Sequence, residues 1–150
     1  MHIEVSVSEQ TLRLMEGDNI VKSYPISTSK FGLGTEEGTN RTPLGNFEIL
    51  EKIGENAPEG TIFCSREPVG IWDREQPPVD DDLVLSRILW LHGLDADNAN
   101  TYDRYIYIHG TNQEELIGTP ASHGCIRMRN TEIIDLFERV KTGTPLIVSE

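Results

Sequence analysis

The segment Ser122-His123-Gly124-Cys125-Ile126-Arg127-Met128 places one of the chain's two cysteines directly after a His-Gly pair. Upstream of it, a run of alternating Tyr and Ile residues ends in His109-Gly110-Thr111. A cysteine attacks as the thiolate, and a free thiol has too high a pKa to be much ionised at neutral pH. A nucleophilic cysteine therefore needs a nearby base or positive charge, and this pattern of histidines and glycines is typical of an activated thiol.

We expect Cys125 to be the nucleophile and His109 to be its base. His109 follows a strand-like run, so a strand, a loop and a return of the chain would bring it to Cys125. Its ring needs a third group to orient it, and the candidates are a backbone carbonyl near Gly110 and the side chain of Thr111. The reaction class that these residues predict is acyl transfer through a thioester.

The backbone beside the cysteine is the candidate oxyanion hole. Consecutive N–H groups of His123, Gly124 and Cys125 are placed to stabilise a developing negative charge. Gly124 suits this position because a side chain there would crowd the approach of a substrate. The candidate substrate-binding residues flank these groups and are Arg127, Ser122 and Gly110.

Two other interpretations of the same residues stay open. A lone cysteine is more often a small buried hydrophobic residue than a nucleophile, and a glycine beside it can simply form a turn. A zinc site is the second alternative, with four candidate ligands: His92, His109, His123 and Cys125. Their spacing matches no common zinc pattern, so we expect neither a metal nor a cofactor.

The remaining cysteine and histidine are expected to be structural. Cys64 lies in a short strand-like run and is expected in the core. Two cysteines do not make a disulfide framework, so both are expected to be free thiols. His92 precedes Gly93 and is expected in a turn.

Alternation of apolar and polar residues dominates the chain and predicts strands. Extended segments are expected at residues 3–14, 20–26, 42–50, 61–64, 83–91, 105–108 and 146–148. One helix is expected to begin with Asn130 as its N-cap and to end at Gly143. Its apolar face is expected to hold Ile133, Ile134, Phe137 and Val140. Many strands and one helix predict a mainly β fold.

Length and composition predict one soluble globular domain over residues 1–150, with 37% hydrophobic and 25% charged residues. Residues 27–40 hold little that can be buried and are expected to form a loop or lid. Residues 66–82 are rich in Pro, Asp and Glu, and we expect them to be a surface insertion.

The net charge of −12 argues against a nucleic-acid partner, which would require a basic surface. No apolar run is long enough to cross a bilayer, so no membrane partner is expected. The residues after Met1 show no secretory signal pattern. The expected location is the cytoplasm if Met1 is the native start, and otherwise the periplasm or the cell-wall side.

Three separated segments resemble the signature of the L,D-transpeptidase (YkuD) catalytic domain family. They are the Cys125 segment, His109-Gly110-Thr111, and Thr42-Pro43-Leu44-Gly45-Asn46-Phe47, which is similar to the family's Thr-Pro-x-Gly-x-Phe. The resemblance implies a β-sandwich-like fold with one main C-terminal helix, and cysteine attack on peptidoglycan stem peptides. It implies the roles already assigned to Cys125 and His109.

The resemblance also implies a reaction. The family's nucleophile cleaves the bond between the L-centre of the third residue, usually diaminopimelate, and the terminal D-alanine. The acyl group of the thioester is then transferred to water or to an amine. Because no leader is visible, we expect an L,D-carboxypeptidase that hydrolyses stem tetrapeptides in murein recycling. The alternatives are an L,D-transpeptidase that forms cross-links and a non-catalytic domain that binds muropeptides.

Overall fold

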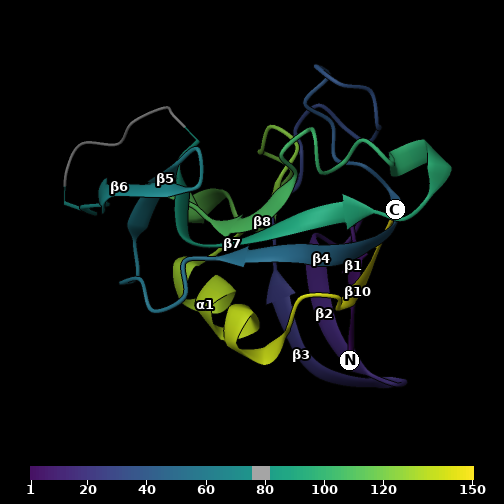
Figure 1. Cartoon of the computed structure of the whole chain (residues 1–150), viewed down its shortest axis with the longest axis horizontal. Helices are drawn as coiled ribbons and strands as arrows, with labels where there is room; N and C mark the ends of the chain where they lie inside the picture. The colour runs from purple at the N-terminus through teal and green to yellow at the C-terminus, as the bar shows by residue number, and fades with distance from the viewer. Residues whose placement is uncertain (76–81) are drawn as a thin grey trace.

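A computed structural model describes residues 1–75 and 82–150 of the chain, and its helices and strands are shown in Figure 1. The strands are β1 (His2–Ser6), β2 (Thr11–Glu16), β3 (Asn19–Pro25), β4 (Gly45–Ile53), β5 (Thr61–Cys64), β6 (Glu67–Ile71), β7 (Val84–Gly93), β8 (Tyr107–Gly110), β9 (Ile126–Met128) and β10 (Pro145–Ser149). The helices are α1 (Asn130–Arg139) and two single 3-10 turns, η1 (Ala96–Asn98) and η2 (Glu114–Leu116). The expected mainly β fold with one main C-terminal helix is confirmed.

The strands follow the order β3-β2-β1-β10-β4-β7-β5-β6, and β8 pairs with both β7 and β9. β4 and β8 both pair with residues Ile88 to Trp90 of β7, so they take its opposite edges. β8 and β9 are parallel to each other. This branch at β7 places the His109 segment, in β8, beside the Cys125 segment, which continues into β9.

Buried apolar side chains from β1–β4, β7–β10 and α1 form one large core cluster. Helix α1 packs against β7 and β8 and lies beneath β7 in Figure 1. It buries Ile133, Leu136 and Phe137, and each such side chain contributes about 2 kcal/mol when fully removed from water. Tyr24 of β3 donates a hydrogen bond to Asp135 of the helix at 2.6 Å. Packing against this core thus fixes the positions of β8 and β9.

Several expected elements are confirmed. Residues 3–14 form two strands, and the segment expected at 20–26 is β3, which pairs antiparallel with β2 so that Glu16 lies opposite Asn19. The apolar run at 83–91 is strand β7, which carries a bulge at Ser86, where φ is +72°. Within the described residues, no helix is long and apolar enough to span a membrane.

The strand expected at residues 105–108 begins and ends later, at Tyr107–Gly110. Tyr105 has a φ of +58°, which breaks the extended backbone before the strand. At the other end, Gly110 is held in register by Leu85 of β7 and Met128 of β9. His109 is therefore inside a strand, not at the loop that follows it.

The helix is shorter than expected and begins differently. Arg129 is its N-cap, Asn130 is its first residue, and Val140 already has an extended backbone. The Asn130 side chain does not cap the helix because it bridges Thr111 O, at 2.9 Å, and the Ser86 hydroxyl, at 2.7 Å. On the apolar face, Leu136 is buried where Ile134 was expected.

Two smaller expectations are wrong. Cys64 is exposed, because Thr61 and Phe63 take the inward positions of β5 and the alternation turns Cys64 outward. His92 lies within β7 instead of a turn, and its Nδ1 is 3.1 Å from Glu48 Oε1 of the neighbouring strand. Both cysteines are free thiols, as expected.

The expected insertion at residues 66–82 includes 76–81, which lie outside the described residues. Residues 67–71 form β6, an exposed strand at the edge of the sheet, and Asp82 enters the cleft beside Cys125. The expected loop at 27–40 begins with three buried residues, Ser27 to Ser29. The backbones of Ser27 and Thr28 form hydrogen bonds with Arg127 and Ser122 of the Cys125 segment. The single-domain organisation of residues 1–150 stays a prediction.

Candidate active site

The parallel pairing of β8 and β9 brings the two motifs together. Ile108 lies opposite Ile126 and His109 opposite Arg127. Cys125 immediately precedes β9, next to Tyr107, and the Tyr107 N–H donates a hydrogen bond to Cys125 Sγ at 3.3 Å. Side chains two apart on a strand share a face, so Tyr107 and His109 point to the side on which the thiol lies.

A cavity of about 500 Å³ opens beside the thiol. It is lined by Asp82, Val84, Tyr105, Tyr107, His109, His123 and Cys125. The thiol also contacts the Tyr105 carbonyl, with Sγ 3.4 Å from the oxygen. The thiol and both imidazoles therefore face one open space.

Burial governs the charge of the thiol and of the imidazole. Cys125 lines the cavity and is partly exposed, but protein atoms crowd its sulfur and this burial raises the pKa of the thiol to about 12. The Tyr107 N–H acts in the opposite direction by stabilising the thiolate. Burial lowers the pKa of His109 below its ordinary value of 6.5. The resting site at neutral pH is therefore a neutral thiol with a neutral imidazole.

The His109 ring is oriented by the carbonyl of Gly110, as expected: Nδ1 lies 2.5 Å from that oxygen. A carbonyl only accepts hydrogen bonds, so Nδ1 carries the proton and Nε2 holds the free lone pair. The side chain is 1% exposed, and this burial fixes the ring. His109 is thus a neutral base with its basic nitrogen defined.

The turn that presents Cys125 is braced by hydroxyl groups. Ser122 donates to Cys125 O at 2.6 Å and accepts from the Gly124 N–H at 3.3 Å. Thr42, from the Thr-Pro-Leu-Gly segment, donates to Gly124 O at 3.0 Å. Gly124 has a φ of +122°, which side chains strongly disfavour. This bracing explains why three separated segments carry one site.

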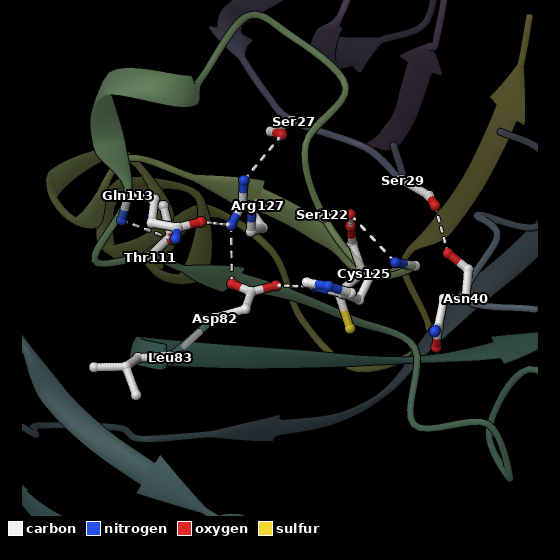
Figure 2. A network of polar contacts seen from close by, with 12 residues as sticks. Ser27, Ser29, Asn40, Asp82, Leu83, Thr111, Gln113, Ser122, Cys125 and Arg127 are labelled. Atoms are coloured by element: carbon white, nitrogen blue, oxygen red, sulfur yellow. Dashed lines mark hydrogen bonds and ion pairs between the residues drawn. The ribbon is translucent and has the colours of Figure 1, made fainter. Parts of the chain in front are cut away.

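Asp82 joins the site through two basic side chains, as Figure 2 shows for its ion pair with Arg127. Asp82 Oδ1 is 3.0 Å from Arg127 Nη1, and Oδ2 is 3.5 Å from His123 Nδ1. Arg127 is fully buried and also donates to Gln113 Oε1 at 2.7 Å. Asp82 could not be singled out from the sequence, because nothing local distinguishes it from the acidic residues before it.

The structure separates the residues proposed from the sequence into two groups. Cys125, His109 and His123 line the cavity. Three candidate substrate-binding residues lie behind its wall and are buried: Ser122, Gly110 and Arg127. Their contacts brace the site, and direct substrate binding by them stays a prediction, as does the oxyanion hole.

The four ligands of the zinc alternative are not brought together. His92 is paired with Glu48 and is not among the residues that line the cavity. Within residues 1–75 and 82–150, no three His, Cys, Asp or Glu side chains are grouped so as to hold a metal ion.

The protein is a mainly β domain in which a cysteine thiol and a buried histidine line one cavity. The family model of the L,D-transpeptidase catalytic domain (YkuD) matches residues 1–148, and the chain belongs to this family. The putative L,D-transpeptidase YkuD of Bacillus licheniformis is 30% identical to it over 147 residues. That match covers 98% of this chain but only 64% of the relative, so the chain spans just under two thirds of its length.

Solved structures share the fold. An L,D-transpeptidase from Mycobacterium smegmatis superposes with a TM-score of 0.63 at 18% identity, covering 99% of this chain and 58% of that one. L,D-transpeptidase 3 from Mycobacterium tuberculosis, solved with a faropenem-derived adduct, gives 0.59 at 20% identity, covering 99% of this chain and 59% of that one. The β-sandwich-like fold implied by the motifs is thus confirmed.

Proposed function

We propose that this chain is a cysteine acyl-enzyme that cleaves the L,D bond between diaminopimelate and terminal D-alanine in peptidoglycan stem tetrapeptides. The observation that carries the proposal is the cavity shared by the Cys125 thiol and the neutral His109. Membership of the L,D-transpeptidase family supports the substrate class.

Acylation begins from the neutral pair. His109 Nε2 takes the thiol proton as Cys125 Sγ attacks the carbonyl carbon of the diaminopimelate L-centre. Because the thiol has a raised pKa, the proton moves during attack and not before it. The tetrahedral intermediate collapses as its C–N bond breaks, and the protonated His109 gives its proton to the departing D-alanine amine. The product is a thioester on Cys125.

The second half of the reaction needs an acceptor. We propose water: His109 Nε2 takes a proton from water as the oxygen attacks the thioester, and Cys125 leaves as the thiol. His123 and Tyr105, which line the cavity, are about half exposed, at 48% of the His123 side chain and 54% of Tyr105. We propose that water reaches the thioester from this exposed side, which would make the chain an L,D-carboxypeptidase of murein recycling.

An amine acceptor is the second candidate, and membership of the transpeptidase family favours it. The amine of another stem peptide would take the place of water and leave a cross-link. Incubating the protein with a disaccharide tetrapeptide, with and without an excess of acceptor stem, separates the two. The water proposal predicts tripeptide and free D-alanine in both reactions; cross-linked dimer as the main product would overturn it.

Faropenem offers an independent probe of the nucleophile. By analogy with the adduct in the M. tuberculosis structure, we expect intact-protein mass spectrometry to show one adduct on the wild type and on Cys64→Ser. Cys125→Ala should show none. An adduct that persists in Cys125→Ala would contradict the assignment of the nucleophile.

A further inference from the structure

The two-residue turn between β5 and β6 has an unusual sequence for its backbone. Cys64 and Glu67 close the hairpin, and the two residues between them both have positive φ: +49° at Ser65 and +66° at Arg66. Such turns strongly prefer Asn-Gly or Asp-Gly, because other side chains are strained there. Strain of this kind persists at sites where the side chain serves a purpose other than stability.

The strained turn places the Arg66 guanidinium on an aromatic cluster. Its Cζ lies 5.0 Å from the centre of the Trp90 ring and 5.2 Å from that of Tyr105. Its Nη1 donates to the Tyr107 hydroxyl at 3.4 Å, a long hydrogen bond. Ring faces attract a cation and hold its plane in one orientation. The guanidinium is therefore positioned without being neutralised.

Two of the three aromatic residues of this cluster line the cavity. Tyr105 and Tyr107 line it together with Cys125, and the Tyr107 N–H contacts the thiol. Arg66 sits at the hydroxyl end of Tyr107. The guanidinium is thus about one tyrosine side chain away from Cys125, against the hydroxyl of a residue that lines the cavity.

The neighbouring arginines are already engaged, whereas Arg66 has no acidic partner in the part of the chain that the structure describes. Arg127 is paired with Asp82, and Arg74 with Glu59 and Glu114. Arg104 donates to the backbone carbonyls of Gly34 and Arg41. In a chain of net charge −12, a cation that is held against residues lining the cavity, with no acidic partner among the described residues, is placed to attract an anion.

We propose that Arg66 binds a carboxylate of the substrate and so selects anionic stem peptides. The proposal rests on the proposed function for the identity of the substrate. A stem tetrapeptide offers two carboxylates near the scissile bond, the terminal one of D-alanine and the side-chain one of diaminopimelate. A planar guanidinium suits either by two parallel hydrogen bonds.

Binding to variants with no nucleophile tests the proposal without requiring turnover. In a Cys125→Ala background, titration calorimetry compares Arg66 with Arg66→Gln for three ligands: the tetrapeptide, its C-terminal amide and its side-chain amide. We expect Arg66→Gln to weaken binding of the tetrapeptide roughly 10- to 100-fold, as for loss of a hydrogen bond between charged groups. The amide that lacks the recognised carboxylate should bind weakly to both proteins and identify that carboxylate.

Two further variants separate recognition from folding. Arg66→Gly relieves the strained turn, so its melting temperature should be equal to or above that of Cys125→Ala alone, while peptide binding falls as in Arg66→Gln. Arg13→Gln removes an equal charge on β2, where Arg13 pairs with Glu9, and should leave binding unchanged.

The proposal is overturned if the Arg66→Gln substitution leaves the affinity for all three ligands unchanged, or weakens the binding of all three equally. It is also overturned if the parent protein binds the tetrapeptide and both amides equally well. A protein that binds the tetrapeptide through Arg66 but releases no D-alanine with Cys125 intact would refute the proposed function and leave the role of Arg66 standing.

Discussion

Asp82 lies with one carboxylate oxygen 3.0 Å from Nη1 of Arg127, whose side chain is fully buried. The pair links a residue two positions before β7 to the strand that follows the Cys125 turn. The other carboxylate oxygen of Asp82 lies 3.5 Å from Nδ1 of His123. A buried charge is tolerated only when it is paired and hydrogen-bonded. The contact with Asp82 therefore stabilises the buried Arg127 beside the Cys125 turn.

Removing that negative charge should be costly. Asp82→Asn keeps the shape of the side chain but leaves Arg127 buried without its counter-charge, and we expect a loss of about 3 kcal/mol in the free energy of unfolding. Urea denaturation measures it. Glu9→Gln is the matched control, because it breaks an exposed ion pair with Arg13 and should cost less than about 1 kcal/mol. Equal small losses would show that the Asp82 pair does not stabilise the fold.

The raised pKa of Cys125 predicts how the resting thiol reacts. In a Cys64→Ser background, alkylation by iodoacetamide should be slow at pH 7 and should accelerate with rising pH without reaching a plateau by pH 10, since the pKa is about 12. A plateau near pH 7 would mean a resting thiolate. Slow labelling alone therefore does not identify a non-catalytic binding domain, and D-alanine release has to decide that alternative.

The lowered pKa of His109 predicts the pH dependence of stability. The folded protein holds this ring neutral, so its contribution is fully present above the unfolded-state pKa of about 6.5 and is lost as pH falls below it. The loss approaches about 1.4 kcal/mol per pH unit until the folded pKa is reached. Comparing the free energies of unfolding of wild type and His109→Gln between pH 7.5 and 5.5 isolates the contribution of His109. Parallel curves for the two proteins would contradict the lowered pKa.

Gly110 is predicted to be essential for packing behind the site. A Cβ there would lie 2.3 Å from Asn130 Oδ1 and 2.7 Å from Leu85 O, so Gly110→Ala should reduce stability by about 2–3 kcal/mol. Gly70→Ala on the exposed strand β6 is the control, since nothing lies within 4 Å of its Cβ position. Thermal unfolding of both variants measures the difference. A melting temperature for Gly110→Ala no lower than that of Gly70→Ala would refute it.

Cys125 and His109, the proposed nucleophile and base, could be singled out in the sequence because each sits in a local motif. Cys125 and His109 are flanked by glycines, and the residues around them alternate as strands do. The carbonyl of Gly110 was likewise predictable as the group that orients the ring, since it is the next residue along the chain. Local chemistry of this kind needs no knowledge of the fold.

What the sequence did not reveal depends on contacts between distant residues. The bounds of β8 are set by its pairing with β7 and β9, and the Asn130 side chain is drawn inward by Thr111 and Ser86. Asp82 and Arg66 look like ordinary surface charges until β7 and the β5–β6 turn place them at the cavity. The exposure of Cys64 was available from the alternation Thr61-Ile62-Phe63-Cys64, which puts it opposite to Phe63.

Release of D-alanine from a stem tetrapeptide tests directly whether Cys125 is the nucleophile. Wild type, Cys125→Ala and Cys64→Ala are compared, with intact mass confirming each protein. We expect wild type and Cys64→Ala to release D-alanine at similar rates and Cys125→Ala to release none above background. Release by Cys125→Ala at the wild-type rate would contradict the assignment of Cys125 as the nucleophile.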